Sequence, residues 1–211
     1  MKKANKKLKK IRVVAYVDGF NLYFGMRAAN FDKYKWLNIK LLIKNLLHSN
    51  QELKEIKYFT SRISNNPDKE KRQTTYIEAL ESIGIKIYYG HYQKSIIECR
   101  KCGNKWVKFN EKMTDVNIAT QMLKDAYNDK YNMAMLISGD SDLIPPIKVI
   151  HNNFTNKRVF VVFPPKRHNN SVSIVAKGSM TIGRKKLADS QFDKKIQKKD
   201  GFILNKPKEW K

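Results

Sequence analysis

The stretch Met133-Ala-Met-Leu-Ile-Ser-Gly-Asp-Ser-Asp-Leu-Ile-Pro-Pro-Ile147 decides the fold of this chain. It begins with five apolar residues, which is typical of a strand that is buried on both faces of a sheet. The run breaks at Ser138-Gly139, and two carboxylates follow, Asp140 and Asp142. A helical spacing of apolar residues then resumes at Leu143. A buried strand, a sharp turn and a helix start place this turn at the carboxyl edge of an α/β sheet, where such proteins keep their sites.

A helix cap is the simplest explanation for an acid at such a turn, since Asp140 or Ser141 would serve as one. One cap accounts for one residue and leaves the second acid unexplained. A similar turn occurs earlier in the chain. Residues 11 to 17 are rich in β-branched side chains and predict a central strand, which ends in Asp18-Gly19-Phe20-Asn21. Asn21 can donate and accept hydrogen bonds there, although Asp18 could instead form a simple Asx turn.

Strands alternate with helices along the rest of the chain. Further strands are expected at 56–63, 85–89 and 158–163. Helices are expected at 38–48, from Asn65-Asn66-Pro67-Asp68 to about residue 82, from a Thr114 cap to about residue 128, and around 171–177 with Ser171 as a possible cap. This alternation predicts an α/β fold with a parallel sheet of about five strands flanked by helices. The expected order across the sheet is 85–89, 56–63, 11–17, 133–137 and 158–163.

Four carboxylates converge in that arrangement. Asp18 and Asp140 follow neighbouring strands at the point where the strand order reverses. Asp115 and Asp142 lie in the first turns of helices that start at the same edge, although an acid there can also simply favour the helix dipole. Crowded carboxylates repel one another, and when ionised they need a cation. Oxygen ligands alone favour Mg²⁺ or Mn²⁺.

The charge of the chain indicates a polyanionic partner. Its 211 residues carry a net charge of +24, far more than solubility requires, and nucleic acid is the expected partner. A membrane surface is a weaker alternative, because no run of about 18 apolar residues exists. Residues 1–10 hold six lysines and predict a basic arm, not a signal peptide, because the apolar run that follows is short and contains Arg12. Two cysteines give no disulfide framework, so a cytoplasmic protein is expected.

An insert at about 91–112 interrupts the alternation and predicts a small hairpin. Cys99-Arg-Lys-Cys102-Gly103 has the spacing of a zinc knuckle, but it is half of a site, and His91 is the nearest histidine. A homodimer could share ligands, and a plain hairpin with reduced cysteines is the alternative. Three aromatic residues of the insert could stack bases or serve as packing. They are Tyr92, Trp106 and Phe109.

Two basic segments follow the last predicted strand. The loop Lys166-Arg167-His168 precedes a helix start and would suit a phosphate, or it is a solvated loop. Residues 11–183 form the predicted main domain, and 184–211 form a basic extension packed on it or trailing from it. One more helix is expected in this extension, and 203–210 are expected to be an extended tail.

Three motifs together resemble the NYN domain of the PIN-like nucleases, most closely its stand-alone bacterial LabA-like group. They are Asp18-Gly19-Phe20-Asn21, Thr114-Asp115-Val116 and Ser138-Gly139-Asp140-Ser141-Asp142, and the resemblance covers roughly residues 11 to 180. It implies a PIN-like Rossmannoid fold, a divalent metal and RNA cleavage. By position it implies that Asp18, Asp115, Asp140 and Asp142 are the metal-site acids. Asn21 and Ser138 would support them.

The sequence therefore predicts a divalent-metal-dependent nuclease, most simply an endoribonuclease acting on single-stranded or structured RNA. Lys112, shortly before Asp115, could contact the scissile phosphate. Two other functions stay open. One is an RNA-binding module that keeps its metal site but cleaves weakly, and the other is a phosphohydrolase acting on small nucleotides.

Overall fold

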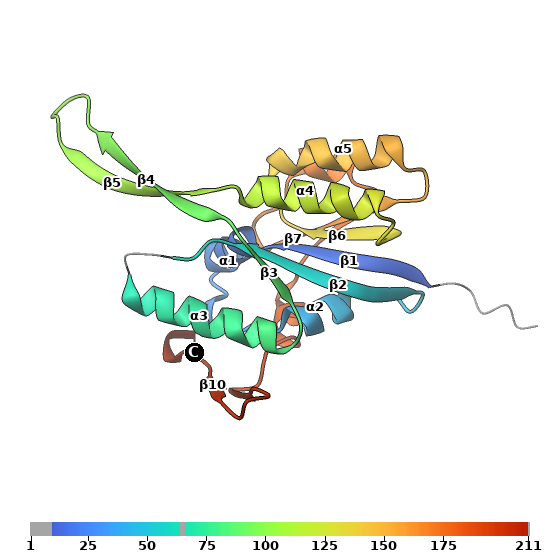
Figure 1. Ribbon diagram of the computed structural model, residues 1–211, viewed down its shortest axis with the longest axis horizontal. Coiled ribbons are helices and arrows are strands. Elements are labelled where there is room, and N and C mark those ends of the chain that lie inside the picture. The colour runs from blue at the N-terminus through green and yellow to red at the C-terminus, as the bar shows by residue number, and fades with distance from the viewer. Residues whose placement is uncertain (1–9, 64–65, 211) are drawn as a thin grey trace, which may run out of the picture.

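The computed structural model describes residues 10–63 and 66–210. A six-stranded parallel sheet forms the middle of three layers, with a layer of helices on each side (Figure 1). Helices α2 and α3 cover one face, and α4 and α5 cover the other (Figure 1). Across the sheet the strands are β3 (Lys86–Tyr89), β2 (Gln51–Thr60), β1 (Ile11–Asp18), β6 (Met133–Ile137), β7 (Arg158–Phe163) and β8 (Ser179–Thr181). The order reverses between β1 and β6, which is the predicted arrangement.

The α/β class and the order of the five predicted strands are confirmed, but the strand count is not. A sixth strand, β8, adds to the edge through a short parallel pairing of Val161 with Ser179. Strand β2 begins at Gln51 and ends at Thr60, earlier than predicted at both ends. Helix α6 (Asn170–Val175) is capped by Asn169 and not by Ser171. The Asn169 side chain accepts from two backbone amides, because it lies directly before the first helical residue, whereas Ser171 is already the second residue of the helix.

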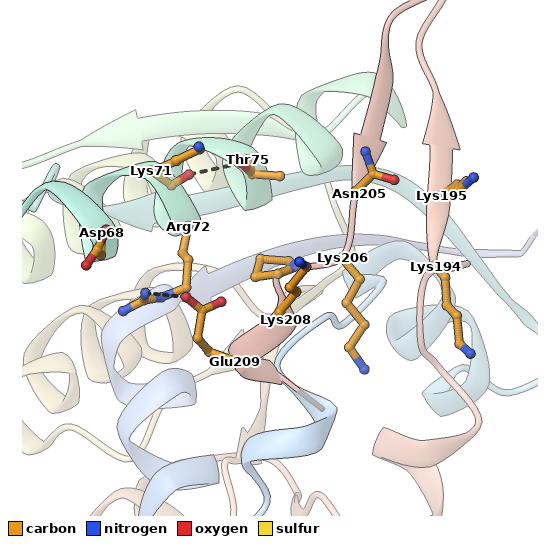
Figure 2. Close-up of a pocket in the computed structure, with 11 residues that line it drawn as sticks. Asp68, Lys71, Arg72, Thr75, Lys194, Lys195, Asn205, Lys206, Lys208 and Glu209 are labelled. Atoms are coloured by element: carbon orange, nitrogen blue, oxygen red, sulfur yellow. Dashed lines mark hydrogen bonds and ion pairs between the residues drawn. The ribbon is translucent and has the colours of Figure 1, made fainter.

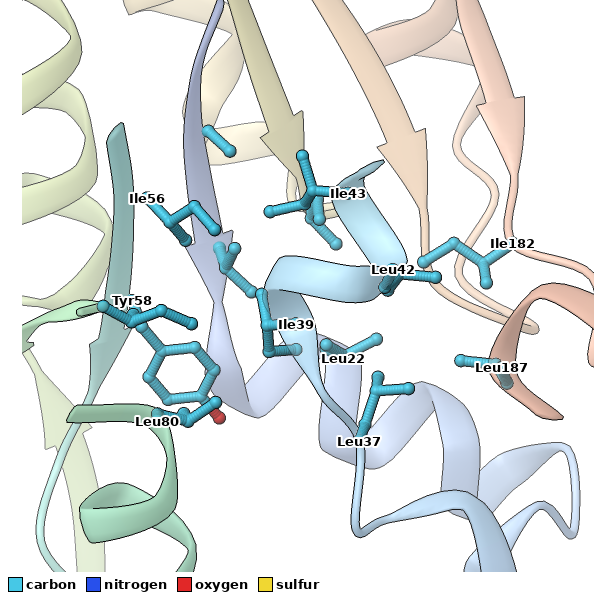
Figure 3. Packing of buried hydrophobic residues seen from close by; sticks show 14 of the residues in the cluster. Leu22, Leu37, Ile39, Leu42, Ile43, Ile56, Tyr58, Leu80, Ile182 and Leu187 are labelled. Carbon is cyan, nitrogen blue, oxygen red and sulfur yellow. The ribbon is translucent and has the colours of Figure 1, made fainter. Parts of the chain in front are cut away.

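Strand β1 supplies both hydrophobic cores, because its side chains alternate across the sheet. Val13, Ala15 and Val17 pack under α1 (Gly19–Ala28), α2 (Ile39–Leu46) and α3 (Pro67–Ser82). Val14 and Tyr16 pack under α4 (Thr114–Tyr127), α5 (Ile144–Asn153) and α6. Figure 3 shows the first core, where Leu42 and Ile43 of α2 lie over the strands. A strand buried on both faces is held rigidly, and so is the carboxylate at its end.

The predicted helix starts have local causes. Asn38 caps α2 by accepting from the Leu41 amide at 3.0 Å. Asn66 caps α3 in the same way, and Pro67 occupies the first helical position, where its missing N–H costs nothing. After the Gly139 turn, a short 3₁₀ turn at Ser141–Leu143 leads into α5.

The insert is a long hairpin that projects from the body of the molecule (Figure 1). Strands β4 (His91–Glu98) and β5 (Lys105–Lys112) pair from His91↔Lys112 to Glu98↔Lys105. Gly103 adopts a positive φ of 69° in the turn, which a glycine allows without strain. The Trp106 side chain is exposed, while the side chains of Tyr92 and Phe109 fall outside the described part of the chain. Strand β5 leads directly back to α4 at the sheet edge.

The C-terminal extension is folded, and the segment expected to be an extended tail is extended only in its first three residues. It contains α7 (Arg184–Ala188), a hairpin of β9 (Lys195–Gln197) with β10 (Ile203–Asn205), and a 3₁₀ turn at Lys208–Trp210. Trp210 is 8% exposed and packs against Trp36 and Tyr76, with ring centroids at 6.2 and 5.7 Å. These aromatic partners lie far away in sequence, so spacing within the tail could not reveal them. Most of the predicted basic arm, residues 1–9, lies outside the described residues.

Within the described ranges, no helix is long and apolar enough to cross a membrane.

Candidate active site

The ends of β1 and β6 are joined by a network of buried polar groups. Asp18 is 4% exposed, and its two carboxylate oxygens accept from the Asn21 amide and the Ser138 hydroxyl, each at 2.9 Å. The Ser138 hydroxyl also accepts from the Asp140 amide at 3.1 Å. Asn21 accepts from the Gly139 amide at 3.1 Å. Ser138 and Asn21 therefore fix the two acidic turns relative to each other.

Gly139 allows the Arg167 loop to lie directly against this turn. A Cβ atom at Gly139 would be 1.9 Å from the Arg167 carbonyl oxygen, so no other residue fits without moving the backbone. The Asn169 side chain donates to the Gly139 carbonyl at 3.1 Å and ties the same loop down. The Gly139 contact thus brings a guanidinium to a cluster of acids.

Helix α4 brings Asp115 to the same edge, and β5 brings an acid that the sequence did not predict. Thr114 does not cap the helix, because Met113 takes that position with a positive φ of 75° and no side-chain cap. The Thr114 hydroxyl instead donates to Glu111, which also accepts from the Ser61 hydroxyl at 3.2 Å. The spacing Glu111-x-x-Thr114 before a helix start was the signal that could have indicated Glu111. Glu111 lies in the hairpin insert, however, and does not follow a strand of the central sheet as Asp18 and Asp140 do.

These side chains line one pocket of about 200 Å³ at the carboxyl edge of the sheet. Four carboxylates and one guanidinium contribute to it, together with Asn21, Thr114 and two phenylalanines. The charged residues are Asp18, Glu111, Asp115, Asp140 and Arg167. Three of the four acids predicted from the sequence, Asp18, Asp115 and Asp140, therefore line one pocket, and Glu111 is a fourth carboxylate in it.

Negative charge is crowded in this pocket. Burial raises the pKa of Asp18 to about 7 against the lowering effect of its hydrogen bonds from Asn21 and Ser138, and Asp115 and Glu111 add to the rise. Burial, followed by the nearby carboxylates of Asp140, Glu111 and Asp142, raises the pKa of Asp115 to about 6. Burial also raises the pKa of Glu111. Within the described part of the chain, none of the four pocket carboxylates forms an ion pair with a lysine or arginine.

The donor set of this pocket suits a hard divalent cation, because all of its ligand atoms are oxygens. The raised pKa values of Asp18 and Asp115 are those expected of buried carboxylates that have no positive charge beside them. Among the described residues, however, no three His, Cys, Asp or Glu side chains are placed to ligate one ion together. The same finding excludes a zinc site around Cys99 and Cys102 built from the described residues of one chain. Both are free thiols, and hydrogen bonds from the backbone of Lys101 and Cys102 lower the pKa of Cys99.

Some predicted site residues lie outside the pocket. Asp142 is exposed, and its amide donates to the Asp140 carboxylate at 2.9 Å, so Asp140 also caps the 3₁₀ turn. Lys112 is exposed at the end of β5 and pairs across the hairpin with His91. Lys166 is exposed on the loop beside Arg167, while the ring of His168 packs edge-on against Phe163, with centroids 4.6 Å apart.

A second pocket of about 280 Å³ adjoins the acid pocket, and six of its sixteen lining residues are aromatic, so it is called the aromatic pocket below. Phe20 and Phe24 line both pockets and form the wall between them.

Comparison with known proteins gives three findings. A family model described as "NYN domain" matches residues 12–181. The 6-hydroxy-3-succinoylpyridine 3-monooxygenase HspA of Pseudomonas putida is 26% identical over 200 residues, covering 77% of this chain and 62% of that protein. The chain thus spans less than two thirds of the length of this curated relative. A protein of unknown function from Vibrio parahaemolyticus, VPA0982, superposes with a TM-score of 0.57 at 20% identity, covering 89% of this chain and 99% of that one.

Proposed function

The chain belongs to the NYN domain family, a branch of the PIN-like nucleases, and we propose that it is a divalent-metal-dependent ribonuclease that acts at the acid pocket. The observation that carries this proposal is the convergence of four carboxylates on one pocket without an ion-pair partner among the described residues. Such a cluster is unfavourable for the metal-free protein, which is typical of groups retained for function. The net charge of +24 supports a polyanionic substrate.

Asp18, Asp115 and Asp140 would hold Mg²⁺ or Mn²⁺, and Glu111 would join them, once these side chains draw together around the cation, since no three of them are placed to ligate one ion in the described metal-free structure. A cation bound there supplies water activation and charge stabilisation for phosphodiester hydrolysis. Ser138 and Asn21 hold Asp18 and the Gly139 turn in register. Ser61 and Thr114 hold Glu111 through hydrogen bonds to one carboxylate oxygen.

Arg167 would bind a substrate phosphate at the rim of the pocket, where its planar donors match phosphate oxygens. Lys166 lies beside it on the same loop and would add charge for a flanking phosphate. The His168 ring, which packs against Phe163, would position this loop. Asp142 lies outside the pocket but close enough to raise the pKa of Asp115, so it would act on the bound cation from a second layer.

Cleavage of a labelled single-stranded RNA in Mn²⁺ and in EDTA tests the proposal. We expect cleavage only in Mn²⁺ and a loss of at least about 100-fold in Asp115→Asn, because the neutral amide no longer supplies a charged ligand. Asp189→Asn is the matched control, since Asp189 is exposed directly after α7 and lines none of the pockets described here. An Asp115→Asn protein that cuts as fast as wild type would contradict the proposal.

Two further outcomes separate the alternatives. RNA that is bound tightly but not cut in Mn²⁺ would indicate a binding module with a retained metal site. Release of phosphate from mononucleotides, with RNA untouched, would indicate a phosphohydrolase acting on small nucleotides.

A second candidate function is oxygenation of a small hydroxylated aromatic ring. The observations that favour it are the 26% identity to a protein named as a hydroxypyridine monooxygenase and an aromatic pocket beside the acids. Oxygen uptake in the presence of 6-hydroxy-3-succinoylpyridine and a reduced nicotinamide tests it. Oxygen uptake that requires both compounds would support this candidate. If no oxygen is taken up, this candidate is refuted and the ribonuclease proposal is unaffected.

A further inference from the structure

The aromatic pocket has an exposed ring at its lip. Phe24 is 42% exposed and lies beside Phe20, with centroids 6.1 Å apart and planes inclined by only 21°. Tyr23 contacts Phe24 edge-on at 5.4 Å and stabilises its orientation. An exposed, supported ring that lines both the acid pocket and the aromatic pocket is a ready platform for a stacked base.

Cations surround the same pocket. The Lys35 ammonium lies 4.5 Å from the centre of the Tyr23 ring, and the side chains of Lys69 and Arg72 reach the pocket from α3. The C-terminal extension contributes Trp210 to the wall of the aromatic pocket, where Trp210 packs against Tyr76. A cavity that combines aromatic and apolar side chains with a cationic margin matches the chemistry of a base attached to phosphates.

A basic groove lies between α3 and the C-terminal extension (Figure 2). Arg72 lines both cavities and pairs with Glu209 at 3.0 Å. The groove measures about 1040 Å³, and lysines dominate its charged lining. They are Lys71, Lys194, Lys195, Lys206 and Lys208, against Asp68 and Glu209. Burial and the nearby Lys194 lower the pKa of Lys206, so positive charge is crowded here as negative charge is crowded among the acids.

We infer that the three cavities form one continuous track for single-stranded RNA, with the scissile phosphate at the acids, an unpaired base on Phe24 and the next phosphates along the lysine groove. The occupant follows from the alternation of acid, aromatic and basic surfaces joined by Phe20, Phe24 and Arg72. A paired base cannot enter the aromatic pocket, so the track selects single strands. This inference rests on the proposed ribonuclease function for the role of the acids.

The base position is tested with a fluorescein-labelled ten-nucleotide oligouridylate, whose binding is followed by anisotropy in EDTA so that nothing is cut. We expect Phe24→Ala to weaken binding about 5- to 100-fold, the loss typical of one stacked base, and Phe24→Trp to retain it. Tyr127→Ala is the matched control. Tyr127 is 67% exposed at the far end of α4, about 18 Å along the helix axis from the acid pocket.

The groove is tested by the salt dependence of the same binding. The double variant Lys194→Glu, Lys195→Glu should flatten the slope of log K against log salt by about 1.4, since each single-strand phosphate contact contributes about 0.7. A control double variant, Lys124→Glu, Lys148→Glu, places the same charge change on α4 and α5, across the sheet from the groove. We expect it to leave the slope at the wild-type value.

Two results overturn the track. One is a Phe24→Ala protein that binds oligouridylate as tightly as wild type. The other is an equal change of slope in the two double variants, which would mean diffuse binding to a basic surface. Because the measurement needs no cleavage, a protein that binds through the track but never cuts RNA would refute the ribonuclease proposal alone. Cleavage that is unaffected by Phe24→Ala would refute the track alone.

Discussion

Helix α4 carries two acids in opposite circumstances, and the difference separates structure from function. Asp125, near its end, is 4% exposed and bonds at 2.6 Å to both the Lys57 ammonium and the Tyr16 hydroxyl. Asp115, in its first turn, has no ion pair within the described part of the chain, and its pKa is raised to about 6. The two residues stand about 15 Å apart along the helix axis.

The charge of Asp125 is neutralised by a lysine of the protein itself, whereas Asp115 would need a bound cation. Burying Lys57 with Asp125 satisfies both charges, and the pair holds α4 on β2. Asp115 instead adds to three other carboxylates at the sheet edge. Burial alone therefore does not mark a functional acid. An acid without a counter-charge, placed where strand order reverses, does.

The largest difference is expected in cleavage. Asp18→Asn should reduce the rate of RNA cleavage at least about 10³-fold, because Asp18 is the most buried of the pocket acids and would be lost as a charged ligand. Initial rates with a labelled RNA in saturating Mn²⁺ measure this. Lys57→Met with Asp125→Leu, which removes the structural pair as a unit, should keep most of the activity of the folded protein. Equal losses in both proteins would erase the proposed distinction.

The next difference is in folding stability. Asp125→Ala should lower the free energy of unfolding by about 3–5 kcal/mol, because it leaves the Lys57 ammonium buried without its partner. Urea denaturation in EDTA measures the loss. Asp115→Asn should cause no loss under the same conditions, since it removes one of several mutually repelling charges. A drop of several kcal/mol in Asp115→Asn would make Asp115 a structural acid like Asp125.

The pH dependence of the metal-free protein sharpens the comparison. The pKa of Asp18 is about 7 in the folded protein, against an ordinary value of 3.8, so the folded state holds this proton more tightly than the unfolded chain does. Its contribution to stability is therefore complete below pH 4 and is lost as the pH rises through about 7, by an amount on the order of 2–4 kcal/mol. Melting temperatures in EDTA between pH 5 and pH 8 should fall in wild type and fall less in Asp18→Asn. A wild-type curve that rises over this range would contradict the raised pKa of Asp18.

Strong local signals made much of this molecule predictable. The central strand order follows from β-branched runs separated by helices, and the turns of Asp18 and Asp140 follow from strands that end in Asp-Gly or Gly-Asp. The missing parts depend on contacts between distant residues. Strand β8 has only three residues, Glu111 reaches the acids from a hairpin insert, and Trp210 is buried by Trp36 and Tyr76. Periodicity within a segment carries no information on such partners.

The smallest effect is expected for the acid that the sequence did not reveal. Glu111→Gln should slow cleavage only about tenfold, because the amide oxygen can still accept from Ser61 and Thr114 while one charge is lost. The measurement is the ratio of initial rates in Mn²⁺ at one saturating RNA concentration. Complete loss of cleavage would mean that Glu111 is as important for cleavage as Asp18. An unchanged rate would mean that Glu111 only stabilises the start of α4 through its hydrogen bond from Thr114.

The account depends most directly on whether the sheet-edge acids bind a divalent cation. Calorimetric titration of Mn²⁺ at pH 8 into wild type, Asp18→Asn, Asp115→Asn and the control Asp189→Asn measures this without any substrate. We predict saturable binding in wild type and Asp189→Asn, and binding at least about 100-fold weaker in Asp18→Asn and Asp115→Asn. Equal Mn²⁺ affinity in all four proteins, or no binding in wild type, would contradict the claim that these carboxylates form a metal site.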